Sequence, residues 1–334
     1  MPPAVRRLPL PIAACALVAL AVAGTALAGN GGFAPVTPQS PNAEAINASY
    51  NWVAIFTGAI FLIVQGALIW FVIRYRRRNR ARSEDGAQVH GNTNLELAWT
   101  IAPVLILVAI GAFIFYKLPQ IRDIPQAEAA AEGAPLTVTV KGYRFYWQYT
   151  YEDGTIAMDR LRAPAGRPVR LLITAPEFDV IHSWWIPAAG GKFDAIPGKV
   201  NETWFKVENP GILRGQCGEF CGIQHAAMLA ELEVMPADTF DTWLDETSRQ
   251  QETGDLDDLG RESYVAACAK CHGMEAQGEV GPPLRGNALV NDPEALEEVV
   301  RNGRGAMPPV GKDWSERQMD ALTGFLREEF GDGG

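Results

Sequence analysis

Two long apolar segments near the N-terminus constrain the fold of this 334-residue chain more than any other feature. They cover residues 52–73 and 97–118, and each is 22 residues long, which is enough for a helix to cross the hydrocarbon core of a membrane. Six arginines lie between them, at positions 74, 76, 77, 78, 80 and 82. Arginine-rich loops stay in the cytoplasm, so the sequence predicts a transmembrane hairpin whose outer ends face outside. Buried helices of a soluble protein are the alternative.

The first 28 residues are typical of a cleaved secretory signal peptide. Arg6 and Arg7 precede an apolar run that ends in Ala-Leu-Ala at positions 26–28. Export of the N-terminus agrees with the topology that the arginines predict. Cys15 would be removed with this segment, although residues 12–15 also resemble a lipoprotein cleavage box, so lipidation at Cys15 is an alternative.

The remaining chain divides by pattern into four further parts. Residues 29–134 contain the hairpin and end in a segment rich in Ala and Glu. Residues 135–236 carry short runs separated by turn residues, at 136–140, 143–151, 169–174, 202–207 and 228–234, which predicts an antiparallel β-sandwich. Residues 237–258 are interpreted as a linker that starts with a short helix. Residues 259–334 are predicted to be all-α, with helices at 261–269, 293–301 and 315–330.

The charge is distributed unevenly along the chain. Residues 1–134 carry 10 Lys and Arg against 7 Asp and Glu, whereas residues 135–255 carry 11 against 17 and residues 256–334 carry 8 against 15. Nucleic-acid binding requires a concentrated cationic face, so two acidic outer parts exclude it as the expected function.

The five cysteines and four histidines are grouped rather than spread. A secreted scaffold held by disulfides would use more cysteines and would place them to close loops. The first group is Cys217, Cys221, His225 and Met228, in the spacing C-x3-C-x3-H-x2-M, with His182 about 35 residues upstream. Thiolate and imidazole select copper or zinc. Structural zinc would use Cys2His2 and give Met228 no role, whereas a thioether is a good weak copper ligand, so copper is favoured.

The second group, Cys268, Cys271 and His272, forms a C-x-x-C-H signal for covalent haem attachment. A thioredoxin-like redox pair is the alternative, but it needs a βαβ setting that the sequence lacks. The iron would take His272 on one side, and Met307, on a loop held by two prolines, is predicted on the other. Met274 is too close to His272, and Met319 is expected in the core of the last helix.

The segment 94–228 resembles subunit II of the haem-copper cytochrome c oxidases. The resemblance rests on the C-x-E-x-C-x3-H-x2-M loop, the upstream His-Ser-Trp segment at 182–184, the turn at 194–198, an aromatic run and the helix hairpin. It implies a cupredoxin-like domain with a dinuclear copper centre, CuA. The resemblance implies three kinds of side-chain ligand and one backbone ligand. These are the thiolates of Cys217 and Cys221, the imidazoles of His182 and His225, the thioether of Met228 and the backbone carbonyl of Glu219. The Glu219 carboxylate would also reach a magnesium ion shared with the catalytic subunit.

The resemblance also implies two transfer paths. In the family the aromatic run holds a Trp at which electrons arrive from cytochrome c, and the alignment of Tyr146 and Trp147 places Phe145 there instead. Strand core is the plainer explanation for part of this run. Glu96, at the cytoplasmic start of the second span, corresponds to a glutamate at the mouth of a proton path, although it could equally be an interfacial anchor.

The sequence therefore predicts the electron-transfer subunit of a caa-type terminal oxidase in the bacterial inner membrane, with its copper and haem domains outside. Electrons would pass from cytochrome c or another respiratory donor through haem c and CuA to subunit I, which reduces O2 with coupled proton pumping; subunit III is a further expected partner. Tethering raises the effective concentration of the haem domain near the copper, so we expect it to remove the need for tight docking. The alternatives are the copper subunit of a nitric-oxide-reducing relative and a copper-delivery protein.

Overall fold

The computed structural model describes residues 35–76, 88, 90–126 and 134–331. The signal peptide with Cys15, four of the six loop arginines and most of the Ala/Glu-rich segment lie outside these residues. The chain forms two compact units, residues 44–123 and the remainder, which are described separately.

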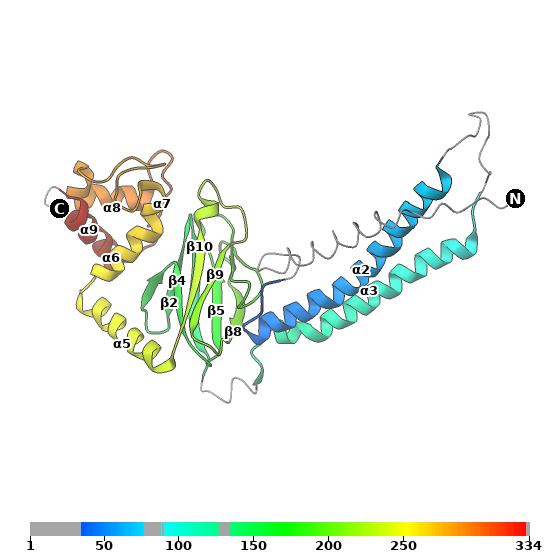
Figure 1. Cartoon of the computed structure of the whole chain (residues 1–334). Coiled ribbons are helices and arrows are strands. Elements are labelled where there is room, and N and C mark those ends of the chain that lie inside the picture. The colour runs from blue at the N-terminus through cyan, green and yellow to red at the C-terminus, as the bar shows by residue number, and fades with distance from the viewer. Residues whose placement is uncertain (1–34, 77–87, 89, 127–133, 332–334) are drawn as a thin grey trace, which may run out of the picture. The chain divides into compact units, whose positions relative to one another are not determined.

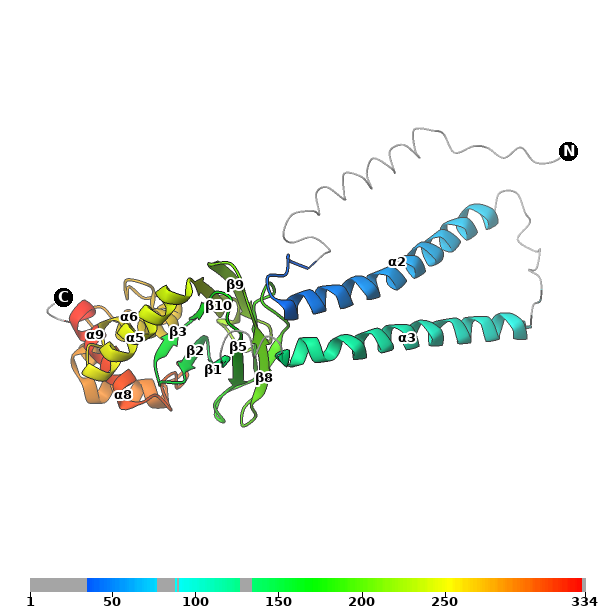
Figure 2. The same ribbon diagram turned by 90° about the horizontal axis from the view of Figure 1, so that it is seen from below.

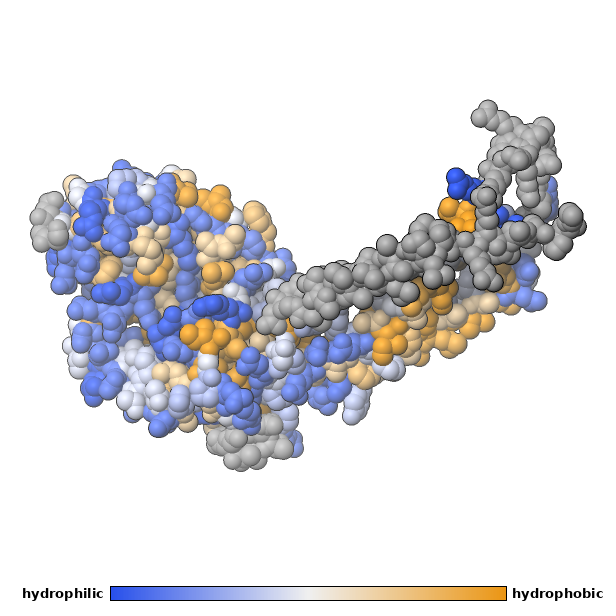
Figure 3. Space-filling model, in the orientation of Figure 1, coloured by the Kyte–Doolittle hydropathy of each residue, from blue (hydrophilic) through white to orange (hydrophobic). Residues whose placement is uncertain are grey.

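The smaller unit is a helix hairpin. Helices α2 (Pro41–Tyr75) and α3 (Thr93–Arg122) are both long and apolar enough to cross a membrane. Trp52 of α2 stacks on Phe113 of α3 with ring centroids 5.0 Å apart, so the helices run alongside each other there (Figure 2). Large apolar side chains stay exposed along both, as the orange surface of the hairpin shows (Figure 3). A lipid environment would cover such a surface.

The larger unit begins with a β-sandwich of two five-stranded sheets (Figure 1). One sheet has the order β3-β2-β1-β5-β8 and the other β4-β10-β9-β6-β7. The strands are β1 (Leu136–Tyr143), β2 (Tyr146–Tyr151), β3 (Ile156–Met158), β4 (Arg160–Pro164), β5 (Val169–Thr174), β6 (His182–Trp185), β7 (Phe193–Ala195), β8 (Asn201–Phe205), β9 (Gly211–Cys217) and β10 (Leu229–Met235).

The predicted sandwich is confirmed, but it is not wholly antiparallel. The pairs β1–β5 and β10–β4 are parallel, and the other strand pairs are antiparallel. Alternate residues of β1 and β5, such as Val138, Val140 and Leu171, are fully buried between the sheets. Burial of these branched side chains gives each strand the period of two that marked it in the sequence.

A helical domain completes the larger unit. Helix α5 (Ala237–Thr253) fills most of the segment interpreted as a linker, and it buries Phe240 against the sandwich. The helices that follow are α6 (Asp257–Ser263), a π-helical turn (Tyr264–Cys268), α7 (Ala269–His272), α8 (Pro293–Asn302) and α9 (Glu316–Phe330), with a short 3-10 turn at Ala288–Asn291. Helices α6 and α9 cross at Gly260, where a Cβ would lie 2.3 Å from the carbonyl oxygen of Ala321. Only glycine allows this close crossing.

Candidate metal centre and haem pocket

The first cysteine–histidine group converges at one end of the sandwich. His182 begins β6 and Cys217 ends β9, and these strands pair through Trp184 and Cys217. The loop 218–224 leads into a 3-10 turn, His225–Ala227, and closes where Cys217 N–H donates to the carbonyl oxygen of Met228 at 2.9 Å. Adjacent strands and one closed loop therefore gather side chains that are distant in sequence.

The ligand atoms of His182, Cys217 and Cys221 lie within 4.8 Å of one another, and all three residues are buried. Cys221 Sγ is 3.5 Å from His225 Nδ1 and 3.8 Å from Met228 Sδ. The donor set of soft sulfur and imidazole suits copper, and it agrees with the spacing argument from the sequence.

The surroundings of Cys217 and His182 suit metal binding. The hydrogen bond from the Cys221 thiol lowers the pKa of Cys217, so that one thiolate forms readily. Neither imidazole nitrogen of His182 makes a hydrogen bond within the described residues, although both are buried. Orphaned buried nitrogens beside a thiolate are the arrangement that a bound metal ion satisfies.

A second layer of residues surrounds His182. Asp179 Oδ1 lies 3.4 Å from His182 Nε2, and it accepts a hydrogen bond from Arg144 Nε at 2.9 Å. Burial alone would raise the pKa of Asp179, but the adjacent His182 imidazole and hydrogen bonds from backbone amides hold it below its usual value. A carboxylate at this position orients the imidazole, as carboxylates do around metal-bound histidines. Sequence reasoning missed both Asp179 and Arg144, because neither belongs to a recognisable spacing.

Glu219 has two separate contacts. Its backbone carbonyl oxygen accepts a hydrogen bond from Cys217 Sγ at 3.2 Å, so the carbonyl points toward the thiol cluster. Its carboxylate pairs with Lys192. The carbonyl and the carboxylate of Glu219 thus have different neighbours.

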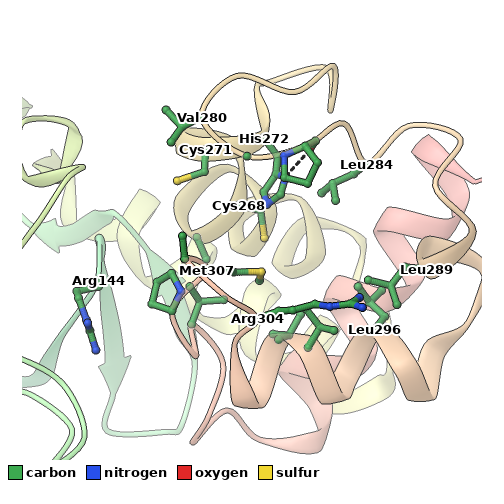
Figure 4. A pocket seen from close by; sticks show the side chains of 18 of the residues that line it. Arg144, Cys268, Cys271, His272, Val280, Leu284, Leu289, Leu296, Arg304 and Met307 are labelled. Atoms are coloured by element: carbon green, nitrogen blue, oxygen red, sulfur yellow. Dashed lines mark hydrogen bonds between the residues drawn. The ribbon is translucent and has the colours of Figure 1, made fainter.

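The second cysteine–histidine group lines a cavity of about 380 Å³ in the helical domain. Cys268, Cys271, His272 and Met307 all contribute to its wall, and apolar side chains such as Leu296 complete it. His272 and Met307 reach into it from opposite sides (Figure 4). His272 Nδ1 lies 2.7 Å from the carbonyl oxygen of Pro282, so Nδ1 donates there and Nε2 is left as the free ligand atom. Both cysteines are free thiols, which haem attachment requires.

The predicted path residues adjoin these two sites. Phe145 lines the haem pocket, and its ring also contacts Gly222 of the copper loop (residues 218–224), where a Cβ would lie 2.9 Å from Phe145 Cε1. Trp147 makes an edge contact with the ring of His182 at 6.1 Å, whereas Tyr146 is turned away toward Trp314. Glu96 lies in the first turn of α3, where Oε1 accepts from Asn92 N–H at 3.2 Å.

Comparison with known protein families agrees with the two sites. The model for the transmembrane domain of cytochrome c oxidase subunit II matches residues 32–116, and that for its periplasmic domain matches residues 155–235. The model for subunit III of cbb3-type cytochrome c oxidase matches residues 255–326.

Individual relatives give the same result. Cytochrome c oxidase subunit 2 of Alkalihalophilus pseudofirmus is 32% identical over an alignment of 326 positions, which covers 91% of this chain and 92% of the relative. A probable cytochrome c oxidase subunit 2 of Rickettsia bellii is 35% identical over an alignment of 246 positions, which covers 67% of this chain and 86% of the relative. The crystal structure of the periplasmic domain of subunit II (CoxB) of Bradyrhizobium japonicum is 32% identical, with a TM-score of 0.33 over 35% of this chain and 96% of that one.

The helix hairpin, the sandwich with its thiol cluster and the helical domain together define a membrane-anchored electron-transfer protein with an extracytoplasmic β-sandwich domain and a cytochrome c domain. The chain belongs to the cytochrome c oxidase subunit II family. It is accordingly a subunit of an oxidoreductase that works with partner subunits, and its two outer domains imply copper and haem.

Proposed function

We propose that this subunit receives electrons from an outside donor at a covalent haem c and passes them through a dinuclear CuA centre to the catalytic subunit, which reduces O2 to water. The observation that carries the proposal is the position of Phe145, which lies between the haem pocket and the copper loop. When bound, the haem and the copper pair supply one-electron carriers. The chain's own residues hold these carriers and exclude water from them.

The copper site assigns a role to each converging donor. Cys217 and Cys221 would hold the ions through their thiolates, His182 and His225 through their imidazoles, Met228 as a weak thioether ligand, and Glu219 through its backbone carbonyl. The strands β6 and β9 hold these donors on a rigid frame, so that little rearrangement accompanies electron transfer.

Cys268 and Cys271 would attach the haem covalently, and His272 and Met307 would hold its iron. The support for this assignment is the free Nε2 of His272, which faces a largely apolar cavity that Met307 also lines. A Met opposite a His raises the reduction potential of haem iron, and that suits a carrier that accepts electrons from a respiratory donor.

Three further assignments complete the proposal. Glu219 contributes its carboxylate to a magnesium site at the boundary with subunit I, Glu96 lies at the start of a proton path, and turnover is coupled to proton pumping. The chain is placed in the bacterial cell membrane beside subunits I and III. The support for Glu219 is that its carboxylate is directed to a cation, Lys192, rather than to the thiol cluster.

Spectroscopy of the purified oxidase tests the two centres together. We expect a seven-line electron-spin-resonance signal, because one unpaired electron is shared by two equivalent coppers, and a haem c band that persists after denaturation. In a Cys217→Ser variant the copper signal should disappear while the haem band remains. A four-line signal of a single copper in the unmodified protein would overturn the dinuclear assignment.

A further inference from the structure

The strands that carry the aromatic run share a hydrophobic core with the helical domain. Tyr143, Tyr146 and Met158 of the sandwich pack with Val310 and Trp314 of the helical domain, and all five are buried. Tyr143 and Tyr146 stack with ring centroids 4.8 Å apart, and Trp314 meets Tyr146 edge-on. Two domains that touched only transiently would bury polar or wet surfaces here instead.

The hydroxyl of Tyr146 is fully used inside this core. It donates to the carbonyl oxygen of Val310 at 2.6 Å and accepts from Trp314 Nε1 at 2.8 Å. All three groups are buried, and in water each would find other partners. Separation of the domains would break both bonds and expose the aromatic surface at the same time.

A second polar contact involves the haem-attachment motif itself. Lys270, between Cys268 and Cys271, donates through Nζ to the carbonyl oxygen of Phe145 at 2.9 Å and pairs with the carboxylate of Asp159. Both charged side chains are largely covered, with exposed fractions of 16% for Lys270 and 26% for Asp159.

The copper loop completes the contact from its own side. Gln224 Nε2 donates to the backbone carbonyl oxygen of Lys270 at 2.8 Å. Ile223, the residue before it, lines the haem pocket together with Phe145 and Arg144. Lys270, in the segment that attaches the haem, is therefore hydrogen-bonded both to Gln224 of the copper loop and to Phe145, the residue before strand β2.

We propose that Lys270, Asp159, Gln224 and Tyr146 form an interdomain clamp that keeps the haem domain permanently docked on the copper domain. These four are positioning residues for electron transfer between the two centres, an inference that rests on the proposed function. The helical domain is thus a fixed part of the sandwich assembly rather than a tethered carrier that docks on each turnover.

The clamp also limits the sites at which a soluble electron donor can deliver electrons. Phe145 has an exposed fraction of only 8%, and the haem-domain residue Lys270 is bonded to its backbone. A soluble cytochrome c therefore cannot reach Phe145 directly, and the fused haem domain is the point at which electrons enter the subunit.

The first test uses the unmodified oxidase and measures the rate of electron transfer from haem c to copper after a light-induced injection of one electron. A docked domain should give a rate that is independent of solvent viscosity and of ionic strength. A rate that falls in proportion to viscosity would overturn the clamp. Complete absence of transfer between two loaded centres would instead overturn the proposed function. Hydrogen exchange of the backbone amides in strand β2 would still show in that case whether the helical domain is docked.

The second test is a variant series in the full oxidase. The double variant Lys270→Met with Tyr146→Phe should transfer electrons at least about tenfold more slowly and become sensitive to viscosity, because buried groups lose their partners. Haem and copper contents and both reduction potentials should stay unchanged, which a general loss of structure would not allow. The single variant Lys270→Arg, with Tyr146 unchanged, should keep most of the rate of the unmodified oxidase.

The matched control is the ion pair at the rim of the same interface. Lys141 Nζ lies 3.1 Å from Asp313 Oδ2, and both side chains are about one-third exposed (32% and 33%). Asp313→Asn should leave the rate unchanged, because exposed pairs contribute little. Equal effects of Asp313→Asn and of the double variant, or no effect of either, would contradict a specific clamp.

Discussion

At the scale of single residues, the two centres differ in how their donors are brought together. Cys217, Cys221 and His225 come from one loop, and only His182 must be supplied by another strand. At the haem pocket, Met307 is about 35 residues from His272 and is positioned by a turn in which Arg304 and Met307 exchange backbone hydrogen bonds of 3.0 and 3.1 Å. The axial position of Met307 is therefore the assignment that depends most on tertiary structure.

Replacement of Met307 by alanine tests this assignment. We expect the haem potential to fall by a substantial part of the about 0.8 V that axial ligands span, because the thioether that favours reduced iron is lost. Redox titration of the haem band measures the shift. Met274→Ala is the matched control, since Met274 is 59% exposed and adjoins the same motif. A potential unchanged in Met307→Ala but shifted in Met274→Ala would show that the wrong methionine was assigned.

Glu96 offers a second test at this scale. Glu96→Gln keeps the size of the side chain and its ability to accept from Asn92 N–H, but it removes the ionisable group. We expect turnover of the oxidase to slow severalfold with copper and haem contents unchanged, as measured by oxygen consumption and metal analysis. Normal turnover in this variant would leave Glu96 as a helix-capping residue only.

At the scale of elements, close packing around the haem motif restricts its backbone. Gly281 lies against the ring of His272, and a Cβ there would be 2.7 Å from His272 Cε1. The carbonyl oxygen of the next residue, Pro282, accepts a hydrogen bond from Nδ1 of the same ring. The loop that covers the haem pocket therefore fixes the orientation of the His272 imidazole, and it can do so only with glycine at position 281.

Gly281→Ala should destabilise the haem domain by about 1–3 kcal/mol, because the ring of His272 must move in a packed site. Thermal unfolding followed at the haem band measures this loss. Gly324→Ala in α9 is the control: a Cβ there meets nothing within 4 Å, and removal of a helical glycine should stabilise by about 0.5–1 kcal/mol. Equal stabilities of the two variants would contradict the contact at Gly281.

At the scale of the whole molecule, the two cofactor sites lie in different hydrophobic cores. The proposed copper donors Cys217, Cys221 and Met228 belong to the sandwich core, whereas Cys268 belongs to the core of the helical domain and Met307 packs against that core. The clamp joins the surfaces of the two domains, but neither ligand set takes a donor from the other domain. Loading of one site should therefore not require the other.

The variant Cys268→Ala with Cys271→Ala should lose covalent haem and keep its full copper content. Metal analysis and a haem stain after denaturing electrophoresis give the two readouts. Electron delivery from an outside donor should stop in this variant, because Phe145 stays covered by the docked domain. Loss of copper together with haem would show that the sites assemble in sequence rather than independently.

Strand prediction from sequence succeeded where burial alternates regularly. The runs at 136–140 and 169–174 became the buried strands β1 and β5. Strands β3, β4 and β7 have only three to five residues, and β9 exposes most of its length, so none of them carries a periodic signal. The parallel pairing of β1 with β5 is equally invisible in the sequence, because it is set by connections that pass between sheets.

The sequence by itself determined the two apolar helices and the family, because a membrane-length apolar run and closely spaced cysteines and histidines are set by residue type along the chain. The two ligand sets stay predictions from the same patterns. Tertiary structure alone decided how the haem domain meets the copper domain. Lys270 and Asp159 are 111 positions apart, and Tyr146 and Trp314 are 168 apart. Contacts over such separations arise from the shapes of two folded surfaces, which no local pattern of residues records.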